Sequence, residues 1–261
     1  MLKTQIHGED RTGSVLVIAH GLFGSGRNWR AIARQLARAR PVVTVDMRNH
    51  GESFHSPRHD YPAMAEDLAE VVEASGAPAD VLGHSMGGKA AMMLALERPE
   101  LVRRLVVADI APVGYDHTQA PLIEAMRAVP LDKVQSRRDA EAVLKPLIPE
   151  DAVRAFLLQS LEILPGGGGR WRLNLDALAA NMDSIIGFPD VEGRRFDGPA
   201  LFVRGGASDY VRPEYEPRIR ALFPAAEIRT IEGAGHWVHA DRPREFIALV
   251  DRFLSDGAEA T

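Results

Sequence analysis

Residues 79–88 read Ala-Asp-Val-Leu-Gly-His-Ser-Met-Gly-Gly, and this stretch decides which fold the sequence predicts. Its first residues suit a buried strand, and they run directly into Gly83-His84-Ser85-Met86-Gly87, which has the pattern G-x-S-x-G. Residues 87–96 then have the composition of a helix. A serine held between two glycines in a tight strand-to-helix turn presents its hydroxyl at the edge of a sheet. The stretch therefore predicts an α/β fold in which Ser85 is a nucleophile.

The regions on either side of this turn alternate between apolar strands and helices. We expect strands at 14–20, 41–46, 79–83 and 104–109, with helices at 29–39, 63–75 and 87–97. Towards the C-terminus we expect strands at 199–204 and 227–231 and helices at 214–222 and 242–254. Nearly all-apolar strands that alternate with helices are typical of a mostly parallel central sheet flanked by helices on both faces.

Residues 114–195, between these two parts, show no strand pattern. The segments 116–129, 136–147, 149–164 and 174–186 have the patterns of helices. Ser136, followed three positions later by Asp139, is a predicted helix N-cap. A helical block of this length exceeds the usual connection between strands. This favours an inserted lid that covers the C-terminal ends of the strands, and the alternative is an ordinary pair of crossover helices. We therefore expect an α/β core of residues 1–113 and 196–261 with a helical cap at 114–195.

The composition excludes several classes of protein. The formal net charge of -5 disfavours nucleic-acid and anionic-membrane partners, since both need basic patches. No apolar run is long enough to span a membrane, and the N-terminus lacks the apolar segment of a signal peptide, so we expect mature sequence there. Because the chain has no cysteine, disulfides, thiolate nucleophiles and cysteine-ligated metals are excluded. These features favour a cytoplasmic protein.

A serine hydroxyl needs a base to take its proton and a carboxylate to orient that base. His236 suits the role of base, because it lies in a glycine-containing loop between the expected strand at 227–231 and the last helix. In this architecture the three residues follow the order serine, acid, histidine. Asp109 and Asp209 both lie between Ser85 and His236, and both come after an expected strand. Either aspartate is therefore a candidate acid.

A tetrahedral oxyanion also needs hydrogen-bond donors. We expect them to be the backbone N–H of Met86, directly after the nucleophile, and that of Leu22, in the turn after the first apolar strand. That turn lacks the glycine patterns of nucleotide-binding loops. The aromatic side chains that are candidates for an acyl pocket are Phe23, Tyr115, Trp171, Tyr210 and Trp237.

Other polar residues are expected to have structural roles. The group His50, His55, His59 and Asp60 could suggest a metal site, but its spacings match no helical pair of histidine ligands, which favours a solvated loop. Lys89, on the helix that follows Ser85, is expected to form an ion pair or to be solvated. We expect the protein to need neither a metal nor an organic cofactor.

Together these motifs resemble those of the α/β-hydrolase superfamily over nearly the whole chain. The resemblance rests on His20-Gly21-Leu22-Phe23-Gly24-Ser25, on Asp46-Met47-Arg48-Asn49-His50-Gly51-Glu52-Ser53, on the G-x-S-x-G turn and on the His236 loop. The second stretch, with Asp109-Ile110-Ala111-Pro112, is similar to a branch of small bacterial carboxylesterases with mitochondrial relatives. The resemblance to that branch implies Asp109 as the acid, with Ser208 near the place where the wider superfamily keeps its acid. Asp209 stays the alternative, because residues 206–213 also fit the wider spacing G-x-x-D-x-x-x-P.

The residues and the resemblance together predict a cofactor-free serine hydrolase. We expect a carboxylesterase that cleaves short- to medium-chain acyl esters, acting on a small-molecule substrate as a monomer or a homodimer. Two alternatives stay open. The same three residues serve carbon–carbon bond hydrolysis and other reactions on this fold, and non-catalytic binding proteins also use hydrolase scaffolds.

Overall fold

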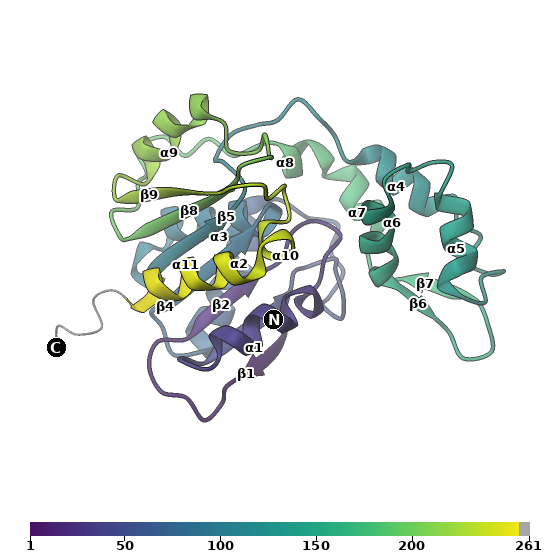
Figure 1. Ribbon diagram of the computed structural model, residues 1–261, viewed down its shortest axis with the longest axis horizontal. Coiled ribbons are helices and arrows are strands. Elements are labelled where there is room, and N and C mark those ends of the chain that lie inside the picture. Colours follow the sequence, from purple (N-terminus) through teal and green to yellow (C-terminus); the bar gives the residue numbers. More distant parts are fainter. Residues whose placement is uncertain (256–261) are drawn as a thin grey trace.

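The centre of the structure is a seven-stranded sheet with the strand order β1-β3-β2-β4-β5-β8-β9 (Figure 1). The computed structural model describes residues 1–255, so residues 256–261 of the expected core range 196–261 lie outside the described residues. The strands are β1 (Lys3–His7), β2 (Leu16–Ala19), β3 (Val42–Asp46), β4 (Ala79–His84), β5 (Val102–Ala108), β8 (Ala200–Gly205) and β9 (Ala226–Ile231). Every strand pair of this sheet is parallel except β1 with β3. The predicted mostly parallel α/β fold is confirmed.

Strand β1, at the edge of the sheet, has no counterpart among the predicted strands. It pairs antiparallel with β3, with Lys3 opposite Asp46. Its side chains are exposed or half-buried, so its sequence lacks an apolar run. Main-chain hydrogen bonds to β3 hold it in place, and these leave no mark on hydropathy.

Helices cover both faces of the sheet. One face carries α1 (Arg30–Leu36), α10 (Val238–Asp241) and α11 (Pro243–Ser255), and the other carries α2 (Tyr61–Ala74), α3 (Met86–Glu97) and α9 (Glu216–Leu222). Short 3-10 helices lie at Gly26–Trp29, Pro99–Leu101, Leu158–Ser160 and Pro213–Tyr215. Leu16 and Ile18 of β2 pack on the first face, and Val17 and Ala19 pack on the second. This burial on both sides is why the strands read as continuous apolar runs. None of the helices within residues 1–255 is long and apolar enough to cross a membrane.

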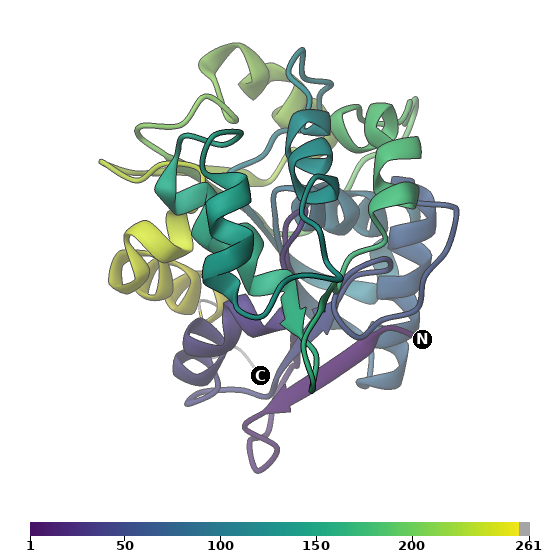
Figure 2. The same ribbon diagram turned by 90° about the vertical axis from the view of Figure 1, so that its right-hand side faces the viewer.

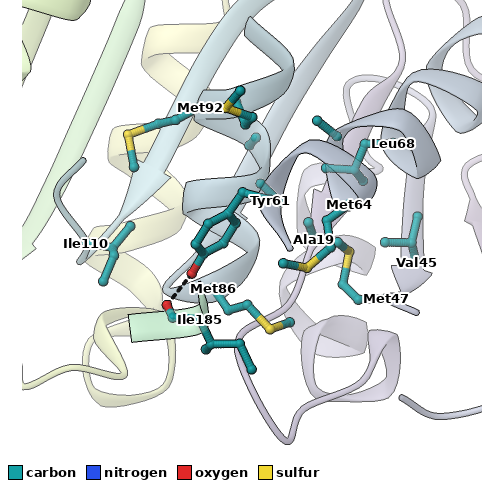
Figure 3. Close-up of a cluster of buried hydrophobic side chains, with 14 of the residues drawn as sticks. Ala19, Val45, Met47, Tyr61, Met64, Leu68, Met86, Met92, Ile110 and Ile185 are labelled. Atoms are coloured by element: carbon teal, nitrogen blue, oxygen red, sulfur yellow. Dashed lines mark hydrogen bonds between the residues drawn. The ribbon is translucent and has the colours of Figure 1, made fainter. Parts of the chain in front are cut away.

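The core between the sheet and helix α2 contains several methionines (Figure 3). Met64 of α2 lies near Met47, and Met86 and Met92 belong to α3. Methionine is flexible and fills irregular space well. Tyr61 is buried among these side chains, and its hydroxyl donates a 2.5 Å hydrogen bond to the carbonyl oxygen of Ile185. This bond connects α2 to the segment that contains residues 114–195.

Residues 114–195 form a lobe beside the sheet (Figure 1), and Figure 2 shows the teal and green helices of this segment in front of the strands. Its elements are α4 (Ala120–Arg127), α5 (Arg137–Leu144), α6 (Asp151–Leu157), β6 (Leu161–Ile163), β7 (Gly169–Trp171), α7 (Leu175–Ala180) and α8 (Met182–Ile186). The capping box at the start of α5 is confirmed, because the Ser136 hydroxyl accepts from the Asp139 N–H and the Asp139 carboxylate accepts from the Ser136 N–H.

The expectation of an all-helical segment with a helix at 149–164 is wrong. Helix α6 ends at Leu157, and β6 pairs antiparallel with β7. Gly166, Gly167 and Gly168 all have positive φ angles and form the turn between the two strands. The glycine tract therefore forms a hairpin turn, because glycine tolerates positive φ angles at three successive positions without strain.

Gly83 occupies a position at the turn after β4 where a side chain has no room. A Cβ atom added there would lie 2.1 Å from the carbonyl oxygen of Gly87 and 2.6 Å from the Cα of Gly88, both of which are backbone atoms. We expect Gly83→Ala to lower the free energy of unfolding by about 3 kcal/mol or more, because neither contact is relieved by a rotamer change. Gly114→Ala is the matched control, since its nearest neighbour would lie 3.9 Å away, and we expect a change within about 0.5 kcal/mol. Equal stability of the two variants in chemical denaturation would contradict this steric argument.

Candidate active site

Ser85 lies at the sharp turn between β4 and α3. Its φ angle of 52° is in the left-handed region, which is strained for a residue with a side chain. A Cβ atom on Gly87 would lie 2.5 Å from the carbonyl oxygen of Ala19, so the glycine after the serine lets α3 approach β2 closely. Positive φ angles also occur at Phe23, Asn49 and Asp109, each of which follows a parallel strand. Backbone strain is thus concentrated in the loops at the end of the sheet where Ser85 lies.

His236 connects Ser85 to Asp109. A 3.0 Å hydrogen bond joins His236 Nε2 to Ser85 Oγ, and His236 Nδ1 donates a 2.8 Å hydrogen bond to Asp109 Oδ2. Asp109 comes directly after β5 and is fully buried. His236 lies in the loop between β9 and α10. The three residues come from separate loops, which the parallel sheet brings together at one edge.

The carboxylate of Asp109 is held by two further donors. Its Oδ1 accepts a 2.8 Å hydrogen bond from the Gly205 N–H, and its Oδ2 accepts from the Ser208 hydroxyl. Asp209, the alternative acid, is exposed, and within residues 1–255 the carboxylate that His236 Nδ1 meets is that of Asp109. The main chain after β8 thus brings Ser208, and not its neighbour Asp209, to the buried carboxylate.

The position of the His236 ring is fixed by two other side chains. Tyr210 stacks on the ring with a centroid distance of 3.8 Å and an angle of 21° between the planes. His84 Nε2 donates a 2.9 Å hydrogen bond to the backbone carbonyl of His236. Burial holds the pKa of His84 well below its usual value, so this ring is neutral. His84 therefore orients the loop without placing a positive charge next to the imidazole of His236.

The loop after β2 lies against Ser85. A Cβ atom on Gly21 would lie 2.9 Å from His84 Nδ1 and 3.2 Å from the Cβ of Ser85, so the glycine allows this close approach. Within the described residues, the backbone N–H groups of Leu22 and Met86 make no hydrogen bond, and both residues line the cavity in front of Ser85. Two free amide donors are thus available next to the serine hydroxyl.

A buried histidine supports this loop. His50 Nδ1 donates to the Arg48 carbonyl at 2.9 Å, which leaves Nε2 free to accept a 3.1 Å hydrogen bond from the Phe23 N–H. Burial lowers the pKa of His50 to about 3, so the neutral form that accepts this bond persists at neutral pH. The expectation of a solvated loop is wrong for His50 and His59, which are both fully buried. The polar residues around these two histidines predict an exposed loop, but the loop folds inward and buries both rings.

A cavity of about 390 Å³ opens in front of Ser85. Four of the five aromatic residues named as pocket candidates line it, namely Phe23, Tyr115, Tyr210 and Trp237. The exception is Trp171, for which the expectation is wrong. Its indole N–H donates to the Met126 carbonyl at 2.9 Å inside the 114–195 segment, and it does not reach the cavity.

Lys89 also lines this cavity and was not expected there. It is 1% exposed, and its ammonium group donates to the carbonyl oxygens of Ile186 and Gly187. The residue is therefore neither solvated nor, within residues 1–255, ion-paired. Lys89 is four residues after Ser85, and residues four apart share a helix face. This spacing was the feature of the sequence that could have placed Lys89 near the site.

A strained serine at the end of a parallel strand, joined through a histidine to a buried aspartate, defines an α/β-fold serine hydrolase. The model of the Alpha/beta hydrolase family matches residues 16–249. The chain belongs to this family, and it is an enzyme.

Comparison with known proteins gives the same class. The chain is 46% identical to the sn-1-specific diacylglycerol lipase ABHD11 of Mus musculus, over 94% of this chain and 82% of that protein. It is 38% identical to Esterase YbfF of Escherichia coli, over 98% of both chains. Among solved structures it is similar to a marine microorganism esterase, with a TM-score of 0.91, 38% identity and coverage of 97% of this chain and 98% of that one.

Proposed function

We propose that the protein is a carboxylesterase that cleaves short- to medium-chain acyl esters through a covalent acyl-enzyme. The observation that carries this proposal is the pair of hydrogen bonds that join His236 to Ser85 at 3.0 Å and to Asp109 at 2.8 Å. A serine is activated by such an arrangement because the histidine can take its proton while the carboxylate holds the correct tautomer. The names of the relatives, which include esterases and a lipase, support the same reaction.

In this proposal Ser85 Oγ attacks the ester carbonyl carbon while His236 Nε2 takes the hydroxyl proton. The negative charge that develops on the carbonyl oxygen is stabilised by the N–H groups of Leu22 and Met86. His236 then gives its proton to the leaving alcohol, which leaves the acyl group bound to Ser85. A water molecule, deprotonated by His236, attacks the acyl-enzyme and releases the carboxylic acid, and Ser85 regains its proton.

The segment 114–195 serves as the cap of the site in this proposal. It contributes Tyr115, Leu122, Phe156 and Ile185 to the cavity walls, so it shapes the space for substrate. Several hydrogen bonds attach it to the core, among them those from the Ser160 hydroxyl to the Phe23 carbonyl and from the Gly51 N–H to the Arg172 carbonyl.

The cysteine-free composition supports a cytoplasmic location for the enzyme.

The proposal is tested with a series of p-nitrophenyl esters from acetate to palmitate. We expect the highest kcat/KM with short and medium acyl chains, and a decrease of about tenfold or more towards palmitate, because a 390 Å³ cavity encloses only a small ligand. Covalent labelling by a fluorophosphonate should accompany activity, since labelling needs an activated serine. A folded protein that neither hydrolyses any ester of the series nor takes the label would refute the proposal. In that case a carbon–carbon bond substrate or simple ligand binding becomes the next hypothesis.

A further inference from the structure

Lys89 places a buried positive charge in the cavity that contains the serine. Its backbone N–H donates to the Ser85 carbonyl at 3.0 Å, so it lies one helical turn beyond the nucleophile. The residue is 1% exposed and belongs to the same cavity wall as Ser85 and Met86. Burial of a charge costs free energy unless other groups stabilise it. The groups that contact the Lys89 ammonium therefore indicate what it can bind.

Within residues 1–255, the partners of the ammonium group are all neutral. Nζ donates to the carbonyl oxygens of Ile186 at 2.9 Å and Gly187 at 2.5 Å. It also lies over the rings of Tyr115 and Tyr61, at 4.7 Å and 5.6 Å from their centroids. No carboxylate within residues 1–255 forms an ion pair with it, and burial lowers its pKa to about 7. An ammonium group has three N–H donors, and the two carbonyl oxygens engage two of them.

The other polar groups around Lys89 are already in use. The Tyr61 hydroxyl donates to the Ile185 carbonyl, as Figure 3 shows. The Tyr115 hydroxyl donates to the Tyr210 carbonyl and accepts from the Ala111 N–H. An anion that entered this part of the cavity would therefore find the Lys89 ammonium as its partner.

The position of Lys89 also indicates which part of a substrate it meets. His236 Nε2 must reach the leaving alcohol oxygen, so the alcohol lies on the side of the His236 loop. That side includes the half-buried Trp237 and the carboxylate of Asp241, which accepts a hydrogen bond from the Gly235 N–H. Lys89 and Tyr61, in contrast, are almost completely buried. With the alcohol on the side of the His236 loop, the acyl group would extend towards the buried end of the cavity where Lys89 lies, which is called the closed end below.

We infer that this closed end binds acyl groups that terminate in a carboxylate, and that the preferred substrates are monoesters of short dicarboxylic acids recognised by Lys89. This inference rests on the proposed esterase function and specifies its substrate class. Hydrolysis of such a monoester consumes one water molecule and releases an alcohol and a dicarboxylic acid. The carboxylate would supply the anionic partner that the buried ammonium lacks within residues 1–255, and charge-assisted hydrogen bonds of this kind are strong.

The inference is tested with two substrates of matched shape, monoethyl glutarate and ethyl glutaramate. The first ends in a carboxylate and the second in a neutral amide. At about pH 6.5, where the ammonium form of Lys89 predominates, we expect kcat/KM to be about tenfold or more higher for the carboxylate. In Lys89→Met, which keeps most of the length of the side chain but not its charge, we expect the ratio to fall to one or below. A wild-type ratio of one or less, or an unchanged ratio in Lys89→Met, would overturn the inference.

The ratio also separates recognition from a structural role. Lys89→Met removes the hydrogen bonds to Ile186 and Gly187, and this loss alone would lower turnover of both esters equally. The ratio should further decrease as the pH rises through about 7, because Lys89 loses its proton. Tyr61 and Tyr115, whose rings face Lys89, stay neutral over this range because their pKa values are raised. His236 lines the same cavity but acts in the hydrolysis of both esters, so its contribution cancels in the ratio. A ratio that does not change with pH contradicts recognition by Lys89.

Binding measurements distinguish failure of this inference from failure of the proposed function. If p-nitrophenyl butyrate is hydrolysed but the glutarate preference is missing, the inference fails and the esterase proposal stands. If no ester is hydrolysed, calorimetric titration of Ser85→Ala with monoethyl glutarate and ethyl glutaramate still tests whether the cavity prefers a carboxylate. Tighter binding of the carboxylate, lost in the double variant with Lys89→Met, supports the site. Equal binding of both compounds refutes it.

Discussion

Replacement of Ser85 by alanine is expected to lower kcat for p-nitrophenyl butyrate by roughly 10⁴- to 10⁶-fold. The variant lacks the oxygen that forms the acyl-enzyme, so His236 has no hydroxyl to deprotonate at 3.0 Å. The remaining rate would come from water attack assisted by the N–H groups of Leu22 and Met86. Steady-state kinetics measure the loss, and a fluorophosphonate probe should label the wild-type protein but not the variant.

The variant should keep its fold, because the main-chain bonds at this position do not involve the hydroxyl. The Ser85 N–H donates to the Ala108 carbonyl at 3.1 Å, and the Ser85 carbonyl accepts from the Lys89 N–H. Ser75→Ala, at the C-terminal end of α2, is the matched control and should retain both activity and labelling. Wild-type ester turnover by a folded Ser85→Ala protein would show that another residue is the nucleophile.

The sequence predicted the parts of the fold and site that depend on local patterns. The strand, glycine turn and helix around Ser85 leave a continuous local signal, because the backbone geometry there needs glycines at 83 and 87. The position of His236 follows from a glycine loop after a strand. The buried strands were found for a similar reason, since burial on both faces requires apolar residues throughout.

The features that the sequence analysis missed depend on contacts between distant segments. Strand β1 has exposed side chains, so only its pairing with β3 reveals it. Trp171 was a pocket candidate because it is aromatic, but it lies in the β6–β7 hairpin and its indole N–H donates to the Met126 carbonyl. Lys89 can be buried because the carbonyl oxygens of the distant residues Ile186 and Gly187 accept hydrogen bonds from its ammonium group. No local pattern near Lys89 records those partners.

The choice between the two aspartates also depends on contacts between distant segments, which the sequence does not reveal. Asp109 and Asp209 both follow strands that end at the same edge of the sheet. What separates them is the path of the chain after β8, where Gly205 and Ser208 both donate to the buried Asp109 carboxylate. Asp209 then faces solvent. A shift of one residue in that loop would place a different side chain next to Asp109, and composition does not record such a shift.

Asp109→Asn is expected to lower kcat by about 10⁴-fold, whereas Asp209→Asn should change it by less than about twofold. The carboxylate of Asp109 accepts from three donors, Gly205 N–H, Ser208 Oγ and His236 Nδ1. An amide has only one oxygen, so its NH₂ group must face at least one of these donors. If it faces His236, the ring nitrogen Nδ1 becomes an acceptor and Nε2 carries the proton. His236 then cannot take the proton of Ser85.

Loss of the carboxylate also removes the negative charge that stabilises the imidazolium formed during attack. Both effects act on kcat, so KM should change much less. Thermal denaturation of the two variants provides the control, because a buried amide that faces a donor destabilises the fold as well. The rate is therefore compared at a temperature where both variants are folded. Full activity in folded Asp109→Asn together with loss of activity in Asp209→Asn would assign the acid to the exposed residue, and the loop after β8 would then have to rearrange when substrate binds.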